Sequence, residues 1–168
     1  MIESSGQILT GRASQDLAAV ITNRPDANGF YRSAYKALVI DSTKAAAEDS
    51  QTKGTWVKIA QSTNTFDEFV GVVGDDHAPQ ANIELTSYHP VCDWKADYNV
   101  KAGDVVTFER NGIISVIAGD DITEGDYLKL GDDGTFVPET AANAYKAVGR
   151  AYETAAEGER FRAMIRSL

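Results

Sequence analysis

The chain has 168 residues, which is the length of one compact domain or of one domain with an arm and excludes a large multidomain enzyme. Hydrophobic residues make up 43% and charged residues 24%, so most of the chain is expected to fold around a core. The formal net charge of −9 and the lack of a visible basic patch argue against nucleic-acid binding.

The first residues carry neither the basic start nor the apolar centre of a secretory signal, and no apolar run approaches the about 18 residues of a membrane-spanning helix. We therefore expect synthesis in a cytoplasm and no membrane partner. Cys92 is the single cysteine, which excludes a disulfide within one chain.

Residues 1–29 differ from the rest, because their apolar residues are isolated between polar ones and end in a turn-rich stretch. We interpret them as an extended N-terminal docking arm, and residues 30–168 as a single β-rich domain. The arm residues expected at a partner interface are Ile8, Leu9, Leu17, Val20 and Ile21.

The middle of the chain reads as strands. Phe30 to Ile40, Thr55 to Ala60, Phe69 to Val73 and Ala81 to Thr86 are rich in β-branched and aromatic residues. Trp94 and Tyr98 follow in a polar stretch typical of an exposed segment, so we predict that they contact a partner.

The C-terminal part predicts hairpins. Val105 to Arg110 and Ile113 to Ala118 flank Asn111-Gly112, a pair that favours a type I′ turn between paired strands. Tyr127 to Leu130 and Thr135 to Val137 flank Gly131 to Gly134 in the same way.

A repeat runs through this part. Gly103-Asp104 falls on Gly125-Asp126 at an offset of 22 residues, and Glu157-Gly158-Glu159 is a third echo. Reuse of common turn residues in a β-rich chain explains the pattern equally well.

Helical signal is restricted to three short stretches, Gln15 to Ile21, Ala45 to Glu48 and Thr140 to Tyr145. The predicted fold class is thus mostly β, a small antiparallel β-barrel or β-sandwich of β-tulip type with an extended N-terminal arm and few short helices.

No catalytic constellation is visible, so we predict no enzyme, no cofactor and no metal site. His77, His89 and Cys92 lack metal-ligand spacing, and Cys92 lacks the surroundings of a nucleophile. The acidic turns at Asp120-Asp121 and Asp132-Asp133 leave calcium binding open, although turn formation explains them as well.

Two stretches carry a family resemblance. Val100 to Phe108, continuing through Asn111-Gly112-Ile113 to Ala118-Gly119-Asp120-Asp121-Ile122, resembles the decoration or cement proteins of tailed bacteriophage capsids. So does Ala147 to Glu159, with a Val-Gly-x-Ala strand, a small-residue turn and a closing strand at Arg160 to Ile165. The resemblance covers roughly residues 65 to 168, with Phe69 to Val73 as an earlier copy of the strand.

The resemblance implies a small, β-rich, non-enzymatic virion protein, commonly a homotrimer, that sits on the capsid exterior and bridges major capsid protein subunits. No individual functional residue carries over. The alternatives are a head fibre base or tail adaptor and, from another class, a small-ligand-binding β-barrel or a trimeric β-fold enzyme.

Overall fold

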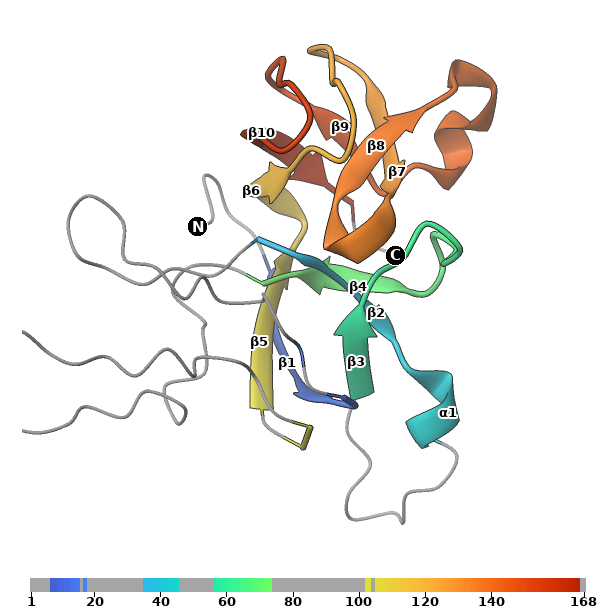
Figure 1. The fold of residues 1–168 in the computed structure, drawn as a ribbon, viewed down its shortest axis with the longest axis vertical. Coiled ribbons are helices and arrows are strands. Elements are labelled where there is room, and N and C mark those ends of the chain that lie inside the picture. Colours follow the sequence, from blue (N-terminus) through green and yellow to red (C-terminus); the bar gives the residue numbers. More distant parts are fainter. Residues whose placement is uncertain are drawn as a thin grey trace, which may run out of the picture.

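The computed structural model describes residues 7–15, 17, 35–45, 56–73, 102–103 and 105–166 (Figure 1). They are mostly β, as predicted. A closed barrel has the strand order β1–β3–β2–β4–β5, with β1 Gln7–Ala13, β2 Ala37–Ile40, β3 Trp56–Ile59, β4 Phe69–Val72 and β5 Val105–Arg110. A second, C-terminal sheet has the order β6–β10–β9–β7–β8, with β6 Gly112–Ile117, β7 Tyr127–Leu130, β8 Phe136–Glu139, β9 Gly149–Ala151 and β10 Arg160–Ile165.

Helices are short, as expected: α1 Ser42–Ala45, η3 Asp132–Gly134 and η4 Ala141–Lys146. Within the described ranges, no helix has the length and apolar character that crossing a bilayer requires. Strand pairing is antiparallel except between β1 and β3, which run parallel. The C-terminal sheet curls, because Ala118 at the end of β6 forms a bridge to Phe136 at the start of β8.

The barrel and the C-terminal sheet share one hydrophobic core. The outer faces of β2 and β4 contribute Ala37, Val39 and Phe69, which pack with inner residues of the C-terminal sheet. The rings of Phe69 and Phe136 meet edge to face, with centroids 6.2 Å apart. A smaller core fills the barrel itself. The two sheets are therefore fixed to each other by apolar packing.

The predicted Asn111-Gly112 hairpin is wrong, although both strands exist. β5 pairs with β1 and β4 in the barrel, whereas β6 pairs with β10 in the other sheet. A type I′ turn needs positive φ at both central residues, and Asn111 has it at 61° while Gly112 does not. The chain instead passes from one sheet into the other at this point (Figure 1). The second predicted hairpin is confirmed as β7 and β8, joined through η3.

Part of the predicted N-terminal arm belongs to the barrel. β1 pairs with β5 over six residues, from Gln7 opposite Arg110 to Arg12 opposite Val105. Leu17 is fully buried in the barrel core. The docking-arm interpretation is therefore wrong for Gln7–Ala13 and Leu17, because β1 pairs along β5 and Leu17 packs in the barrel core. Residues 1–6 and 18–29 lie outside the described residues.

The glycine repeat corresponds to a repeated structure. Three glycines precede β5, β7 and β10 with φ values of 91°, 93° and 84°, namely Gly103, Gly125 and Gly158. Their N–H groups donate at 2.8–2.9 Å to the carbonyls of alanines at the ends of partner strands, Ala13, Ala151 and Ala118. The sequence echo is thus one turn used three times.

Candidate interaction surface

Three of the predicted interface residues, Ile8, Leu9 and Leu17, lie in the described part of the chain. The backbones of Ile8 and Leu9 pair with Glu109 and Phe108 within the barrel. Leu17 lies in the core and has no surface to offer a partner, which corrects its assignment. The predictions for Val20, Ile21, Trp94 and Tyr98 fall outside the described residues.

His77, His89 and Cys92 also lie outside the described residues, as does the predicted strand at 81–86. Within the described part of the chain, no group of three metal-binding side chains gathers. Carboxylates of the acidic turn at Asp120-Asp121 accept hydrogen bonds from backbone N–H groups. Asp121 accepts a hydrogen bond from the Glu157 N–H at 3.1 Å, and Asp120 accepts one from the Asp121 N–H at 2.8 Å.

A clasp of polar contacts joins the barrel to η3. Lys36 forms a 2.9 Å ion pair with Asp133, and the Ser62 N–H donates to Asp132 at 3.0 Å. This bonding to Ser62 holds the pKa of Asp132 below its usual value. Charge-assisted contacts at the rim therefore supplement the apolar core.

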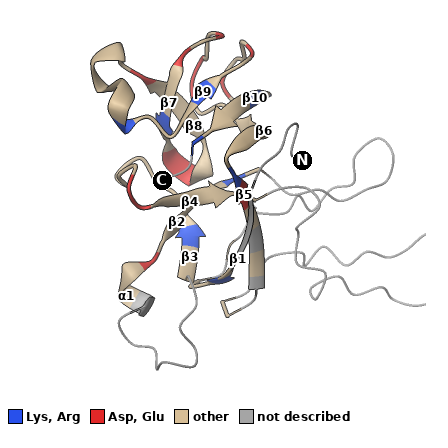
Figure 2. Ribbon diagram, turned by 180° about the vertical axis from the view of Figure 1, so that it is seen from behind, with Lys and Arg blue, Asp and Glu red and all other residues tan. Residues whose placement is uncertain are grey.

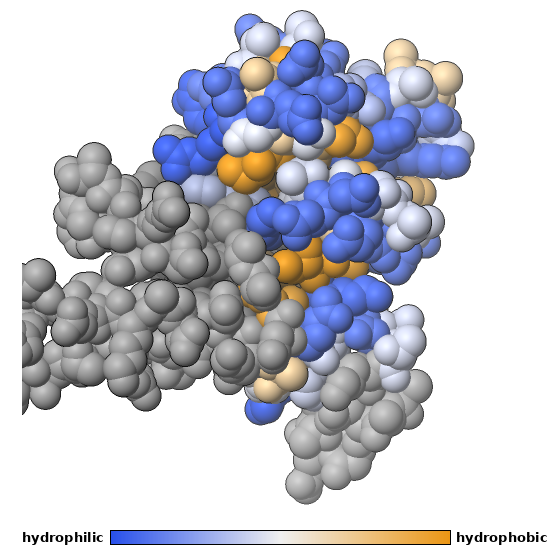
Figure 3. Space-filling model, viewed as in Figure 1, coloured by the Kyte–Doolittle hydropathy of each residue, from blue (hydrophilic) through white to orange (hydrophobic). Residues whose placement is uncertain are grey.

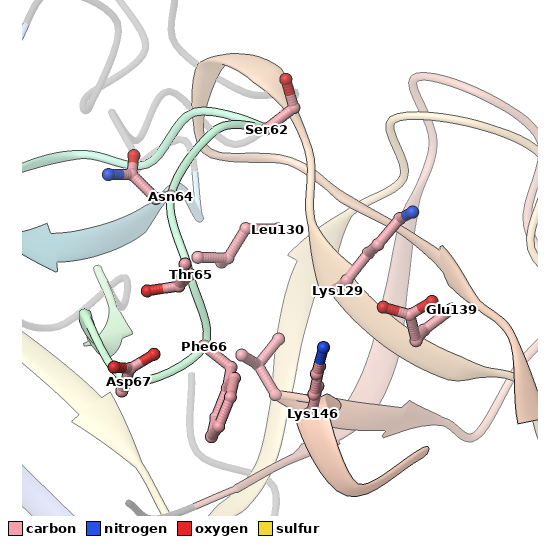
Figure 4. Close-up of a pocket in the computed structure, with 10 residues that line it drawn as sticks. Ser62, Asn64, Thr65, Phe66, Asp67, Lys129, Leu130, Glu139 and Lys146 are labelled. Atoms are coloured by element: carbon pink, nitrogen blue, oxygen red, sulfur yellow. The ribbon is translucent and has the colours of Figure 1, made fainter. Parts of the chain in front are cut away.

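Beside this clasp lies a cleft of about 230 Å³ between the loop of residues 62–67 and the C-terminal sheet. Figure 4 shows Lys129, Glu139 and Lys146 on one side and the loop on the other, with Leu130 between them. The loop holds its own shape, because the Thr65 N–H and hydroxyl both donate to Glu68 at 3.0 Å. Both bonds lower the pKa of Glu68, and the bond from the Thr65 backbone N–H has the larger effect.

The outer face of the C-terminal sheet carries a row of register partners. Ile113 on β6 is opposite Met164 on β10, which is opposite Arg150 on β9, which is opposite Tyr127 on β7. Opposed residues of neighbouring strands project to the same face. A groove of about 190 Å³ lies over this row, and we name it the arginine groove; it is lined by Tyr127, Ala144, Ala147, Gly149, Arg150, Met164 and Arg166.

The two arginines of the groove are held by neutral groups. Arg150 donates from Nε to the Gly125 carbonyl at 3.1 Å and stacks its guanidinium 5.2 Å from the Tyr127 ring centroid. Arg166 donates from Nη1 to the carbonyls of Tyr145 and Ala147 at 2.9 and 3.2 Å. These contacts fix the side chains without neutralising their charge.

Further along the same face, a carboxylate compensates the next arginine. Arg162 donates to Glu153 at 2.7 Å, and this bond lowers the pKa of the Glu153 carboxyl. Arg160 donates to the Tyr35 hydroxyl at 2.8 Å and lies over its ring. Sequence reasoning missed this basic face, although alternation in Arg160-x-Arg162-x-Met164-x-Arg166 is the signal for it.

Two acidic loops, residues 118–126 and 151–159, connect strands of this sheet, and Figure 2 shows acidic residues on loops at this end of the molecule. They bind each other reciprocally: Ile122 and Ala155 exchange N–H···O bonds of 2.8 and 3.0 Å. From the side drawn in Figure 3, the C-terminal sheet is largely hydrophilic with smaller hydrophobic areas between. Charge on this end of the molecule is thus sorted, with acid in the loops and arginine in the groove.

Residues 95–166 match the family model of phage cement protein, which confirms the expected resemblance for this part of the chain. The match takes in the whole arginine groove. Among solved structures, the crystal structure of the N base of head fibre gp8.5 of bacteriophage phi29 is similar at 21% identity and a TM-score of 0.46, over 96% of this chain and 95% of that one. No curated protein matches the sequence.

Proposed function

We propose that this protein is a cement protein that binds the outer surface of a phage capsid and strengthens contacts between major capsid protein subunits. The observation that carries the proposal is the match of residues 95–166 to phage cement protein. That range includes β5 and the entire C-terminal sheet, so the matched region and the basic outer face coincide.

The architecture suits this role. A ligand that binds only the assembled shell stabilises it by mass action, and needs a rigid body with accessible contacts rather than chemistry. The shared core supplies rigidity, and the outer face of the C-terminal sheet supplies exposed arginines beside an exposed Met164. Catalysis, a cofactor and a metal form no part of the proposal.

Self-association belongs to the proposal as well, as a homotrimer on the particle. Closed cyclic symmetry would let one small protein contact several shell subunits at once, and multiple contacts raise avidity.

The test uses particles assembled without this protein, to which the purified full chain is added. We expect saturable co-sedimentation with the particles and a higher temperature of particle disruption in its presence. Unassembled major capsid protein is the control and should bind less, because the lattice contact is incomplete. Failure of the wild-type chain to bind particles would overturn the proposal. Binding at a single tail vertex or to fibres would favour a head fibre base or tail adaptor instead.

A further inference from the structure

We propose that the arginine groove is the docking site for an acidic segment of protein on the capsid surface, with Arg150 and Arg166 each receiving a carboxylate. This inference rests on the proposed function, and it names the contact and the chemistry of the partner.

The groove retains donors for such a ligand. A guanidinium has five N–H groups in a planar fork that matches a carboxylate. Among the described residues, Arg150 donates only through Nε and Arg166 only through Nη1. The remaining N–H groups of both side chains can therefore form a bidentate pair.

The walls of the groove leave room for a neighbouring chain. Ala144, Ala147 and Gly149 line the groove, and all three have a small side chain or none. Met164 is 37% exposed and Tyr145 on η4 is 62% exposed. An exposed thioether and an aromatic ring beside fixed arginines are typical of protein contacts.

Charge decides between an acidic protein and a nucleic acid. The chain carries a net charge of −9, and one of the two acidic loops, residues 118–126, contributes the Gly125 carbonyl that holds Arg150. An extended polyanion crossing the groove would also cross these loops and be repelled. A short segment with a few carboxylates would meet only the arginines.

The experiment compares two matched charge reversals, Arg150→Glu and Arg12→Glu. Both residues are exposed and sit in Gly-Arg-Ala triplets, Gly149–Ala151 and Gly11-Arg12-Ala13, and each change lowers the net charge equally. Titration of particles lacking the protein should show about a 30-fold weaker affinity for Arg150→Glu, as for loss of a desolvated charge pair, and less than a threefold change for Arg12→Glu. Far-ultraviolet circular dichroism and urea midpoints establish that both variants fold.

Two further variants keep the test decisive. Arg166→Gln should weaken binding without reversing charge, and covers the case in which Arg150→Glu fails to fold. Arg150→Lys should rescue only part of the affinity, because an ammonium cannot form the bidentate pair.

If folded Arg150→Glu and Arg166→Gln bind particles as tightly as the wild type does, the inference is overturned. The proposed function would remain intact, because the wild type still binds. The inference would also be overturned by binding of a 20-nucleotide single-stranded DNA in an Arg150-dependent manner, or by an Arg150→Glu effect that appears only in the protein's own self-association during sedimentation. No binding by any variant, the wild type included, would be a failure of the proposed function.

Discussion

A substitution at Leu17 tests whether the N-terminal segment is part of the barrel core. The Leu17 side chain is fully buried and packs in the barrel core with Leu38, Val57 and Phe108. We expect Leu17→Ala to lower the free energy of unfolding by about 2–4 kcal/mol, because it removes buried methyl groups and leaves a cavity. Urea denaturation measures this. Ile40→Ala is the control, since Ile40 is 39% exposed and its truncation should cost far less. Equal effects of the two changes would mean that Leu17 is not a core residue.

Substitutions at Gly125 distinguish the cost of backbone strain from the cost of steric crowding. A Cβ at this position would meet no atom within 4 Å, yet φ is +93°. We expect Gly125→Ala to cost about 1–2 kcal/mol of stability through the backbone alone. Gly125→Asn should cost less, because asparagine tolerates positive φ better. Thermal unfolding of the two variants compares them, and a larger loss for asparagine would point to crowding instead.

One repeated sequence pattern could have been used to predict a strand and was missed. Gly11-Arg12-Ala13 repeats Gly149-Arg150-Ala151, and both triplets end strands whose alanine carbonyl accepts a bond from a turn glycine. Comparison of the triplets would have placed β1 in a sheet. The burial of Leu17 could not be inferred this way, because isolated apolar residues between polar ones carry no periodic signal.

At the scale of elements, strands were easier to predict than their partners. The residues of β3, β4, β7 and β8 alternate or run apolar as strands do, and all of them form. The Asn111-Gly112 pair favours a hairpin locally, but β1 and β4 pair with the two edges of β5, so a hairpin with β6 would displace one of them. Pairing with strands that are distant in the sequence overrides the local turn preference, and the residues around the turn do not indicate it.

The loop of residues 62–68 makes stability depend on pH. The pKa of Glu68 is lowered in the folded protein, chiefly by the Thr65 backbone N–H, and that of Asp132 by bonding to Ser62. A lowered folded-state pKa means that the stabilisation is complete above the unfolded pKa and is lost as pH falls through the folded one. We expect the urea midpoint to fall from pH 6 to pH 3, and Glu68→Gln to reduce that fall by lowering the midpoint mainly at pH 6.

Glu124→Gln is the control for this pH series, because Glu124 is an exposed carboxylate on the loop of residues 118–126. If Glu68→Gln and Glu124→Gln change the pH profile alike, the effect is general charge and not the Thr65 contact.

At the scale of the whole molecule, the closure of the barrel by β1 predicts that removal of the N-terminal residues destabilises the fold. Deleting residues 2–22 removes the strand that pairs with both β5 and β3, and also removes Leu17. We expect the product to lose cooperative unfolding of the barrel and to be cleaved rapidly by protease, because the edges of β3 and β5 lose their partner. A truncated chain with the wild-type unfolding midpoint would restore the docking-arm interpretation.

The sequence predicted the fold class and the C-terminal family resemblance, since both rest on local turns and alternation. It did not predict that two sheets share the core through Phe69 and Phe136, because that contact joins residues far apart in the chain. The arginine groove was not predicted for a similar reason, because its lining residues lie on β7, β9 and β10, which are separate in the sequence.

The measurement that tests the proposed role most directly is a cryo-electron microscopy difference map between particles made with and without this protein. We expect added density outside the shell at many symmetry-equivalent positions, into which the barrel and C-terminal sheet fit with the arginine groove toward the capsid subunits. Identical maps, or added density confined to one tail vertex, would contradict the role of a capsid cement protein.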